Sequence, residues 1–254
     1  MSSCAGCGTA LDVQKEKRMQ SGSTQKNGPS ILNAKTATCI LLLYFATEAI
    51  CDILAGLTGL SEITGLVLSS VLGGGVMIFA SIVLLQKQLK DIGPTGSAWV
   101  GGRLNAIMIG LIIGFAIGFS EHVLTLIAKP HIPYQDLSTL QRMVLIPGLQ
   151  QWICIIVVLL GSPVEEMLFR GVIYGGYRKT FGPMWAAIST TLIFVAIHVP
   201  YYSHFAPAVI VYIALALSAL WCRLRWNAIG PAAALHIGYN LMVAFWIVYR
   251  TSHR

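Results

Sequence analysis

The chain has 254 residues, of which 56% are hydrophobic and only 11% are charged, and its net charge is +7. A soluble domain carries about 25% charged residues, so this composition excludes an ordinary soluble protein. The basic residues lie mostly between long apolar runs, so membrane topology explains the charge better than nucleic-acid binding does, and we expect no nucleic-acid partner. The sequence predicts an all-α, polytopic membrane bundle of about seven (six to eight) transmembrane helices around a polar intramembrane cavity.

Residues 1–35 are predicted to form a flexible, polar, cytosolic N-terminal tail. Lysines and arginines alternate there with Ser, Gly, Gln and Asn, without the apolar core or cleavage site of a secretory signal peptide. Cys4 and Cys7 have the spacing of half a zinc knuckle, but a structural zinc takes four ligands and the sequence has no second such pair. We therefore favour a free tail over a zinc site.

Residues 36–250 are predicted to form one transmembrane domain, with the catalytic core at about 145–250. Runs of about 20 apolar residues are long enough to cross the hydrocarbon layer as helices. The seven expected spans are residues 36–60, 63–85, 105–127, 149–175, 183–199, 206–222 and 227–249.

The first span carries Glu48 and Asp52, which are four residues apart and therefore share one helical face. They either line a polar cavity or pair with another helix. The third span places Gly110, Gly114 and Gly118 four residues apart, which predicts close packing against a neighbouring helix.

The third span ends near Glu121 and His122. For this pair we favour a position at the membrane–water interface over a supporting position behind a functional site.

The distribution of basic residues predicts the orientation of the bundle. With the N-terminus in the cytosol, twelve of the seventeen Lys and Arg residues lie on the cytosolic side, four lie outside and Arg170 lies within a helix. An excess of positive charge in cytosolic loops is the pattern that membrane insertion favours. We therefore expect a cytosolic N-terminus.

The fourth, fifth and seventh spans each carry polar residues inside an apolar run. Ionisable groups at membrane depth cost several kcal/mol unless they are paired or wetted, which makes them candidates for a functional site. Spacings of four residues place the members of each motif on one helical face. The residues are Glu165, Glu166 and Arg170 in the fourth span, Phe194 and His198 in the fifth, and His236 and Asn240 in the seventh.

We expect Glu166 to pair with Arg170, which neutralises one carboxylate and leaves Glu165 free for another task. A rise of about 1.5 Å per residue, counted from the cytosolic ends of the three spans, places Glu165, His198 and His236 in one layer of the membrane. A carboxylate and a histidine that face one water molecule form a general-base pair. A second histidine with the Asn240 amide supplies donors for a developing oxyanion.

This set of side chains fits hydrolysis of an amide. We disfavour covalent acyl-enzyme chemistry, because no serine or cysteine clearly lies beside a base and Ser162 is better explained as a helix cap. The main local alternative makes Glu165 and Glu166 the acidic first turn of a helix that begins at Pro163, with Ser162 and Glu165 as its capping box. His198, taken alone, is then a packed structural histidine.

The motifs Glu165-Glu166-x-x-x-Arg170, Phe194-x-x-x-His198 and His236-x-x-x-Asn240 resemble the CPBP family of intramembrane proteases. This family includes the CAAX prenyl endopeptidases and the Abi proteins of bacteriocin processing and self-immunity. The resemblance covers residues 145–250 and implies a helical bundle around a conical cavity that opens to the cytosol and to lipid.

The resemblance also implies a role for each motif residue. Glu165 and His198 activate water, His236 and Asn240 stabilise the oxyanion, and Glu166, Arg170 and Phe194 support the site.

The family is often labelled a metalloprotease family, and Glu165, His198 and His236 are the candidate ligands of a divalent metal such as zinc. The sequence lacks a His-Glu-x-x-His pair, and Asn240 suits an oxyanion hole better than a metal site. We therefore favour a mechanism without a cofactor.

The expected partners are membrane lipid and a membrane-tethered protein or peptide substrate, prenylated if the host prenylates proteins. The expected location is the cytoplasmic membrane of a prokaryote or the endoplasmic reticulum membrane of a eukaryote. A non-proteolytic scaffold or immunity protein that binds a peptide or membrane partner is the alternative from another class. A transporter would carry internal inverted repeats, and none is evident.

Overall fold

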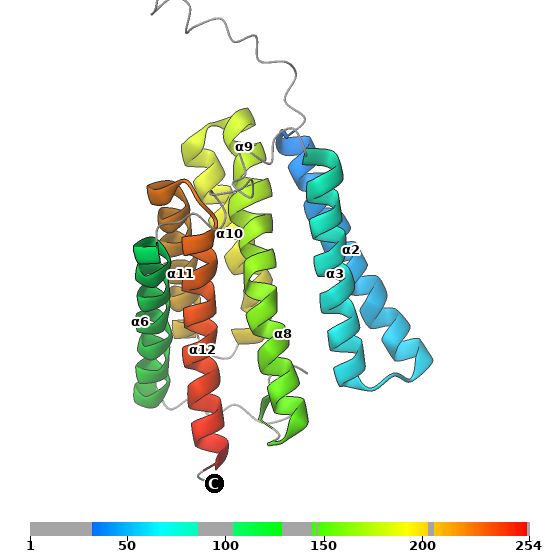
Figure 1. The fold of residues 1–254 in the computed structure, drawn as a ribbon, viewed down its shortest axis with the longest axis vertical. Coiled ribbons are helices and arrows are strands. Elements are labelled where there is room, and N and C mark those ends of the chain that lie inside the picture. The colour runs from blue at the N-terminus through cyan, green and yellow to red at the C-terminus, as the bar shows by residue number, and fades with distance from the viewer. Residues whose placement is uncertain (1–31, 86–103, 129–143, 146, 203–205, 253–254) are drawn as a thin grey trace, which may run out of the picture. The chain divides into compact units, whose positions relative to one another are not determined.

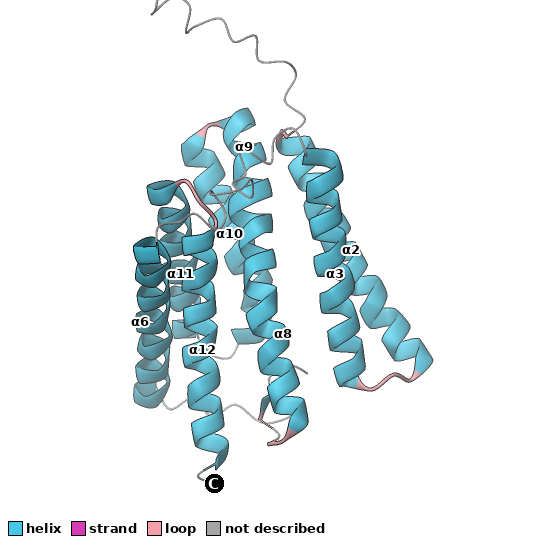
Figure 2. Ribbon diagram, viewed as in Figure 1, coloured by secondary structure: helices cyan, strands magenta, loops and turns pink. Residues whose placement is uncertain are grey.

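A computed structural model describes residues 32–85, 104–128, 144–145, 147–202 and 206–252, and residues 1–31 of the predicted tail, with Cys4 and Cys7, lie outside them. The described chain is helical and contains no strand (Figures 1 and 2). Its elements are α2 (Ala34–Thr58), α3 (Glu62–Leu85), α6 (Leu104–Ala128), α8 (Leu149–Glu166), the π-helix η2 (Met167–Ile173), α9 (Tyr174–Phe181), α10 (Pro183–Tyr202), α11 (Ala206–Trp226) and α12 (Gly230–Ser252).

Each of the seven predicted spans corresponds to helix in the structure, with α8, η2 and α9 forming one continuous span. Five of the helical segments are long and apolar enough to cross a membrane, and two shorter apolar helices accompany them. The long ones are Ala34–Thr58, Leu104–Ala128, Leu149–Phe181, Pro207–Trp226 and Gly230–Tyr249, and the shorter ones are Ile63–Phe79 and Pro183–His198. The predicted all-α membrane bundle is confirmed, and the protein is an integral multi-pass membrane protein.

Several of the predicted boundaries are wrong: the fifth and sixth helices extend to Tyr202 and Trp226, and the seventh begins at Gly230. The fourth span continues to Phe181 rather than ending at 175, and it stops at Gly182, whose positive φ of 85° favours glycine. The predicted tail ends too late, because Leu32 is already buried and α2 begins at Ala34. Asn33 caps that helix by accepting a hydrogen bond from the backbone N–H of Thr36 at 3.1 Å.

Helix α8 lies between α12 and α3, and the π-helix that follows it contacts α2, α10 and α11 (Figure 1). α2 and α3 pack against each other as an antiparallel pair. The segment from Glu165 to Arg170 therefore lies where elements from both ends of the chain meet. This arrangement explains why the motif segment is the most deeply enclosed part of the fourth span.

Helices α6 and α12 are in backbone contact through glycines. A Cβ atom at Gly110 would lie 2.2 Å from the carbonyl oxygen of Pro231, and one at Gly114 would lie 1.9 Å from that of Leu235. From the other side, a Cβ at Gly238 would lie 2.5 Å from the carbonyl oxygen of Leu111. The predicted packing stripe is confirmed, and its partner is the helix that carries His236 and Asn240.

We predict that Gly114→Ala destabilises the protein, because the added methyl group overlaps the α12 backbone. Overpacking of this kind costs about 1–3 kcal/mol, which should lower the thermal midpoint in detergent. Gly75→Ala is the matched control, since a Cβ there meets no atom within 4 Å. Equal melting of the two variants would contradict the close contact.

Candidate active site

Ser162 and Pro163 lie inside α8 and do not begin a helix. The Ser162 hydroxyl donates to the carbonyl oxygen of Val158 at 3.0 Å, one turn earlier in the same helix. The prediction that Ser162 is a helix cap is therefore wrong, and so is the capping-box alternative for Glu165. The apolar residues before Ser162 continue the helix through the motif, so the two carboxylates lie at the end of a long helix instead of its first turn.

The motif crosses from α-helix to π-helix directly after Glu166. All seven residues of η2, Met167–Ile173, are buried, which a helix with one exposed face does not permit. The packing of α2, α10 and α11 around this segment accounts for the burial. π-Helical turns inside α-helices occur frequently at functional sites, and here the turn carries Arg170 directly behind the carboxylates.

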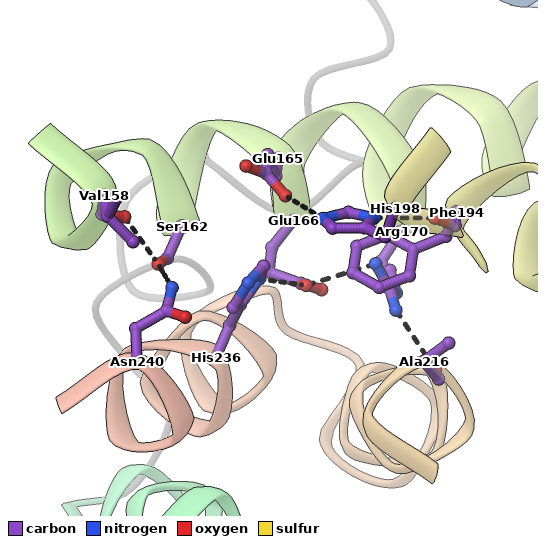
Figure 3. A network of polar contacts seen from close by, with 10 residues as sticks. All are labelled: Val158, Ser162, Glu165, Glu166, Arg170, Phe194, His198, Ala216, His236 and Asn240. Atoms are coloured by element: carbon purple, nitrogen blue, oxygen red, sulfur yellow. Dashed lines mark hydrogen bonds and ion pairs between the residues drawn. The ribbon is translucent and has the colours of Figure 1, made fainter. Parts of the chain in front are cut away.

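Glu166 is fully buried and holds two partners with one oxygen atom. Its Oε1 lies 3.1 Å from Nη1 of Arg170, which confirms the predicted ion pair. The same Oε1 lies 3.0 Å from Nδ1 of His236 (Figure 3). Because an ionised carboxylate only accepts hydrogen bonds, Nδ1 of His236 is the donor, and Nε2 is left for another partner.

A second contact joins the same two helices one turn away. Nδ2 of Asn240 donates to the Ser162 hydroxyl at 2.8 Å (Figure 3). Ser162 and Glu166 are four residues apart on α8, as His236 and Asn240 are on α12, and the pairs match in antiparallel order. Two hydrogen bonds therefore fix the face of α12 that carries His236 and Asn240 against α8.

Arg170 is the largest fully buried side chain of the described protein, with 2% of its surface exposed. Besides Glu166, it binds the carbonyl oxygen of Ala216 on α11 through Nη2 at 3.1 Å. Its guanidinium group lies 4.3 Å from the centroid of the Phe194 ring, within cation–π range. The charge of Arg170 is thus shared among a carboxylate, a carbonyl and an aromatic face, which makes its burial tolerable.

His198 is held by its own helix and faces Glu165. Its Nδ1 lies 2.7 Å from the carbonyl oxygen of Phe194, so Nδ1 is the donor and Nε2 points to the carboxylate. The distance from Nε2 of His198 to Oε2 of Glu165 is 3.8 Å (Figure 3). Tyr212 of α11 stacks on the imidazole with ring centroids 4.8 Å apart, which fixes the plane of the ring.

The two facing groups keep some access. The side chains of His198 and Glu165 are 16% and 29% exposed, whereas Glu166 is wholly enclosed. Oε2 of Glu165 is itself buried and accepts no hydrogen bond from any residue that the structure describes, so the exposed part of this side chain is elsewhere on it. A contact of 3.8 Å is longer than a hydrogen bond but suits a water molecule that bridges both groups. The surroundings of the two glutamates are therefore the predicted ones: Glu166 is enclosed in its ion pair with Arg170, and Glu165 faces His198.

The structure joins six of the seven predicted site residues through direct contacts, and Asn240 lies one turn from His236 on α12, bound to Ser162. Sequence reasoning missed Ser162 as a partner of Asn240 and Tyr212 as a partner of His198. The four-residue spacing of Ser162, Glu166 and Arg170 was a signal for the first. Nothing in the local sequence marks Tyr212, because it lies on a helix without a motif.

The polar residues of the first three spans take different positions. Glu48 packs against α3, where a Cβ atom at Gly73 would lie 3.1 Å from its Cγ, and it also lies within electrostatic range of Glu165. Asp52 is exposed. For Glu48, contact with another helix is therefore observed, at Gly73 of α3, while its carboxylate is hydrogen-bonded by Tyr44 of its own helix.

The interfacial position predicted for Glu121 is wrong. Its side chain is buried and accepts a hydrogen bond from the Tyr239 hydroxyl of α12 at 2.6 Å. His122 stacks on Trp246, also of α12, with ring centroids 3.7 Å apart and ring planes 7° from parallel. Both residues therefore join α6 to the helix that carries His236 and Asn240.

The candidate metal ligands do not form a preassembled metal site. Within the described part of the chain, no three His, Cys, Asp or Glu side chains gather closely enough to hold an ion. The Nδ1 atoms of His198 and His236 contact a carbonyl and a carboxylate, as set out above. Glu165 lies 3.8 Å from Nε2 of His198 and within electrostatic range of His236. The arrangement divides these residues into two pairs, Glu165 with His198 and Glu166 with His236.

The comparison with protein families identifies this arrangement. Residues 147–242 match the family model described as type II CAAX prenyl endopeptidase Rce1-like. Over these residues the chain is similar to that family. The match includes all seven motif residues, so the family predicted from the motifs is confirmed, while α2, α3 and α6 lie outside it. No curated protein and no solved structure gave a match to the chain.

We predict that Glu166→Ala lowers the stability of this Rce1-like protein by about 3–5 kcal/mol, because it leaves the Arg170 charge buried without its carboxylate. The fall should appear as a lower midpoint of thermal unfolding in detergent. Glu165→Gln is the control, since Glu165 lies outside this ion pair. A Glu166→Ala protein that melts with the wild type would remove the ion pair as the basis of the site's stability.

Proposed function

We propose that the protein is an intramembrane endopeptidase that hydrolyses peptide bonds of membrane-associated proteins or peptides, prenylated CAAX tails among them. The observation that carries the proposal is the division of the site into two carboxylate–histidine pairs. One pair is partly accessible, with Glu165 3.8 Å from His198, and the other is buried, with Glu166 3.0 Å from His236. The family match over residues 147–242 supports the same reaction class.

In this proposal the accessible pair activates a water molecule. The water lies to one side of the pair, within hydrogen-bond reach of Oε2 of Glu165 and Nε2 of His198, and gives its proton to the Glu165 carboxylate as its oxygen attacks the scissile carbonyl carbon. The Phe194 carbonyl keeps the Nδ1 proton of His198 engaged, so Nε2 is the atom that receives a hydrogen bond from the water. General-base catalysis of this kind contributes roughly 10²–10⁴-fold to the rate.

The buried pair and Asn240 stabilise the negative charge that develops on the carbonyl oxygen. Asn240 uses one N–H to bind Ser162, which orients the amide and leaves a second N–H for the oxyanion. His236 donates through Nε2 when its ring is protonated, and the Glu166 carboxylate at Nδ1 stabilises that imidazolium. Donors fixed before the reaction stabilise the transition state without reorganisation, at about 10²–10³-fold for one donor.

The tetrahedral intermediate then collapses. The carbon–nitrogen bond breaks, and the proton held by Glu165 passes to the leaving nitrogen, so that the products are a carboxylic acid and an amine. One water molecule is consumed and the side chains return to their starting protonation states. Arg170 takes no part in proton transfer. Its charge holds the Glu166 carboxylate in place from the side away from His236.

The substrate class follows from where the site lies. The motif residues of the fourth and seventh spans belong to helices long and apolar enough to cross a membrane, and Phe194 and His198 belong to a shorter apolar helix. A peptide must therefore reach them from the bilayer or along the membrane surface. A lipid-anchored tail supplies such a peptide, and we propose membrane lipid and a tethered protein or peptide as the partners. We also propose a cytosolic N-terminus, in the cytoplasmic membrane of a prokaryote or the endoplasmic reticulum membrane of a eukaryote.

We predict that Glu165→Gln and His198→Ala each abolish cleavage while the protein stays folded in detergent. The probe is a prenylated peptide with a CAAX tail in lipid vesicles, and its products are measured by mass spectrometry, with the unprenylated peptide as the matched substrate. Cleavage at the wild-type rate in either variant would refute the mechanism. A biological effect that survives Glu165→Gln would favour the non-proteolytic scaffold instead.

The same Glu165→Gln protein should retain substrates that it cannot cleave. Mass spectrometry of peptides bound to this variant, compared with those bound to Glu165→Gln/Asn240→Ala, identifies the substrate. We expect hydrophobic or lipidated C-terminal segments in the first sample. Soluble, unmodified peptides in their place would contradict a membrane-tethered substrate.

Because the histidines and carboxylates divide into two pairs, we propose that no exchangeable metal ion is needed. Cleavage of the vesicle-bound peptide should continue at an unchanged rate after exhaustive chelation and dialysis. Loss of activity on chelation, with recovery on addition of zinc alone, would refute this proposal. It would also identify Glu165, His198 and His236 as the ligands to test by substitution.

A further inference from the structure

A buried hydrogen bond joins α6 to α12 beside the site. The Tyr239 hydroxyl donates to Oε2 of Glu121 at 2.6 Å, and the two residues are 2% and 9% exposed. The distance lies within the range of a well-formed O–H···O hydrogen bond. Tyr239 directly precedes Asn240 and follows His236 by three residues, so this bond acts on the turn that carries both.

The helix that supplies Glu121 lies outside the family match and provides no residue to the proposed mechanism. It nevertheless lies against the backbone that carries His236 and Asn240. A Cβ at Gly114 would be 2.8 Å from the backbone nitrogen of Tyr239, and one at Gly118 would be 3.0 Å from its carbonyl oxygen. Contact this close is not needed to bury an apolar face, but it leaves α12 no room to move toward α6.

The glycine contact and the hydrogen bond constrain different motions. A glycine stripe is smooth, so it fixes the distance between two helices but resists sliding along the axis only weakly. The bond between Glu121 and Tyr239 is directional and links two fixed points, so it sets the axial register of α12. A slip of one residue would move His236 and Asn240 by about 1.5 Å.

Tyr239 also contacts the other half of the site. Its ring lies 6.0 Å from the ring of Tyr212, at 73°, and Tyr212 stacks on His198 at 4.8 Å. One side chain therefore touches α6 through its hydroxyl and the support of His198 through its ring. Tyr239 therefore connects the helix of the oxyanion donors to the support of the general-base pair.

We propose that Glu121 and Tyr239 are positioning residues, whose hydrogen bond fixes the depth of His236 and Asn240 relative to Glu165 and His198. The inference rests on the proposed function for its kinetic consequences. A misplacement of about 1 Å in catalytic groups costs about 10²-fold in rate. α6, which carries no catalytic motif, is thus a functional part of the site.

The first test measures kcat and KM on the vesicle-bound prenylated peptide. Tyr239→Phe and Glu121→Leu should lower kcat by about 10–100-fold with KM unchanged. Glu121→Gln should stay within about threefold of wild type, because its amide oxygen still accepts the hydrogen bond. Ser120→Ala is the control, since that hydroxyl binds only the Ala116 carbonyl of its own helix. Wild-type kcat in Tyr239→Phe would overturn the proposal.

A double-mutant cycle separates positioning from general weakening of the fold. If Tyr239 acts through the oxyanion donors, Tyr239→Phe should cause a smaller loss in an Asn240→Ala background than in the wild type, because only His236 is then left to be misplaced. If the two losses multiply, Tyr239 acts independently of Asn240 and the proposal is wrong.

A third measurement does not depend on catalysis. In histidine-labelled protein, the Nδ1 proton of His236 reports its bond to Glu166 by NMR. Its signal should shift in Tyr239→Phe and Glu121→Leu but keep its position in Glu121→Gln and Ser120→Ala. An unchanged signal in all four variants would overturn the positioning role. If the wild type cleaves no peptide but the signal shifts as expected, the proposed function fails and the positioning of α12 stands.

Discussion

One buried carboxylate oxygen, Oε1 of Glu166, holds the site together. It lies 3.1 Å from Arg170 and 3.0 Å from His236, and so joins the π-helix behind it to α12 in front of it. Each partner alone would be costly at this depth, because a buried charge without a counterion destabilises a protein by several kcal/mol. Together they form a neutralised cluster with a fixed geometry, and Glu165 next to it remains available to substrate.

The cluster also explains why three helices far apart in the sequence converge. Arg170 binds the Ala216 carbonyl of α11 and lies over the Phe194 ring of α10, and the Phe194 carbonyl in turn orients His198. Ser162 repeats the link to α12 one turn away through Asn240. His198, His236 and Asn240 are therefore each oriented by another polar or aromatic group, as preorganised catalysis in a low-dielectric site requires.

Outside the family match, the protein completes the site with apolar packing and a few polar contacts. Helices α2 and α3 enclose the side of α8 opposite α12, with Glu48 against Gly73, and α6 lies against α12 through its glycines. The deepest polar contact of these helices is the bond between Glu121 and Tyr239. Such contacts resist separation of helices in lipid, where no hydrophobic driving force holds one apolar helix to another.

The sequence by itself determined the fold class, the seven spans and the residues of the site, because apolar run length and four-residue spacing are local properties of a helix. Local spacing also predicted the pair of Glu166 with Arg170 and the glycine stripe of α6. Local spacing predicted the wrong surroundings for Ser162 and Glu121. A capping box and an interfacial pair are local patterns, and contacts with residues on other helices override them. Only the tertiary structure decided that Ser162 binds Asn240, that Glu121 binds Tyr239 and that Tyr212 supports His198. These contacts join residues on different helices, and no spacing within one helix records which faces will meet.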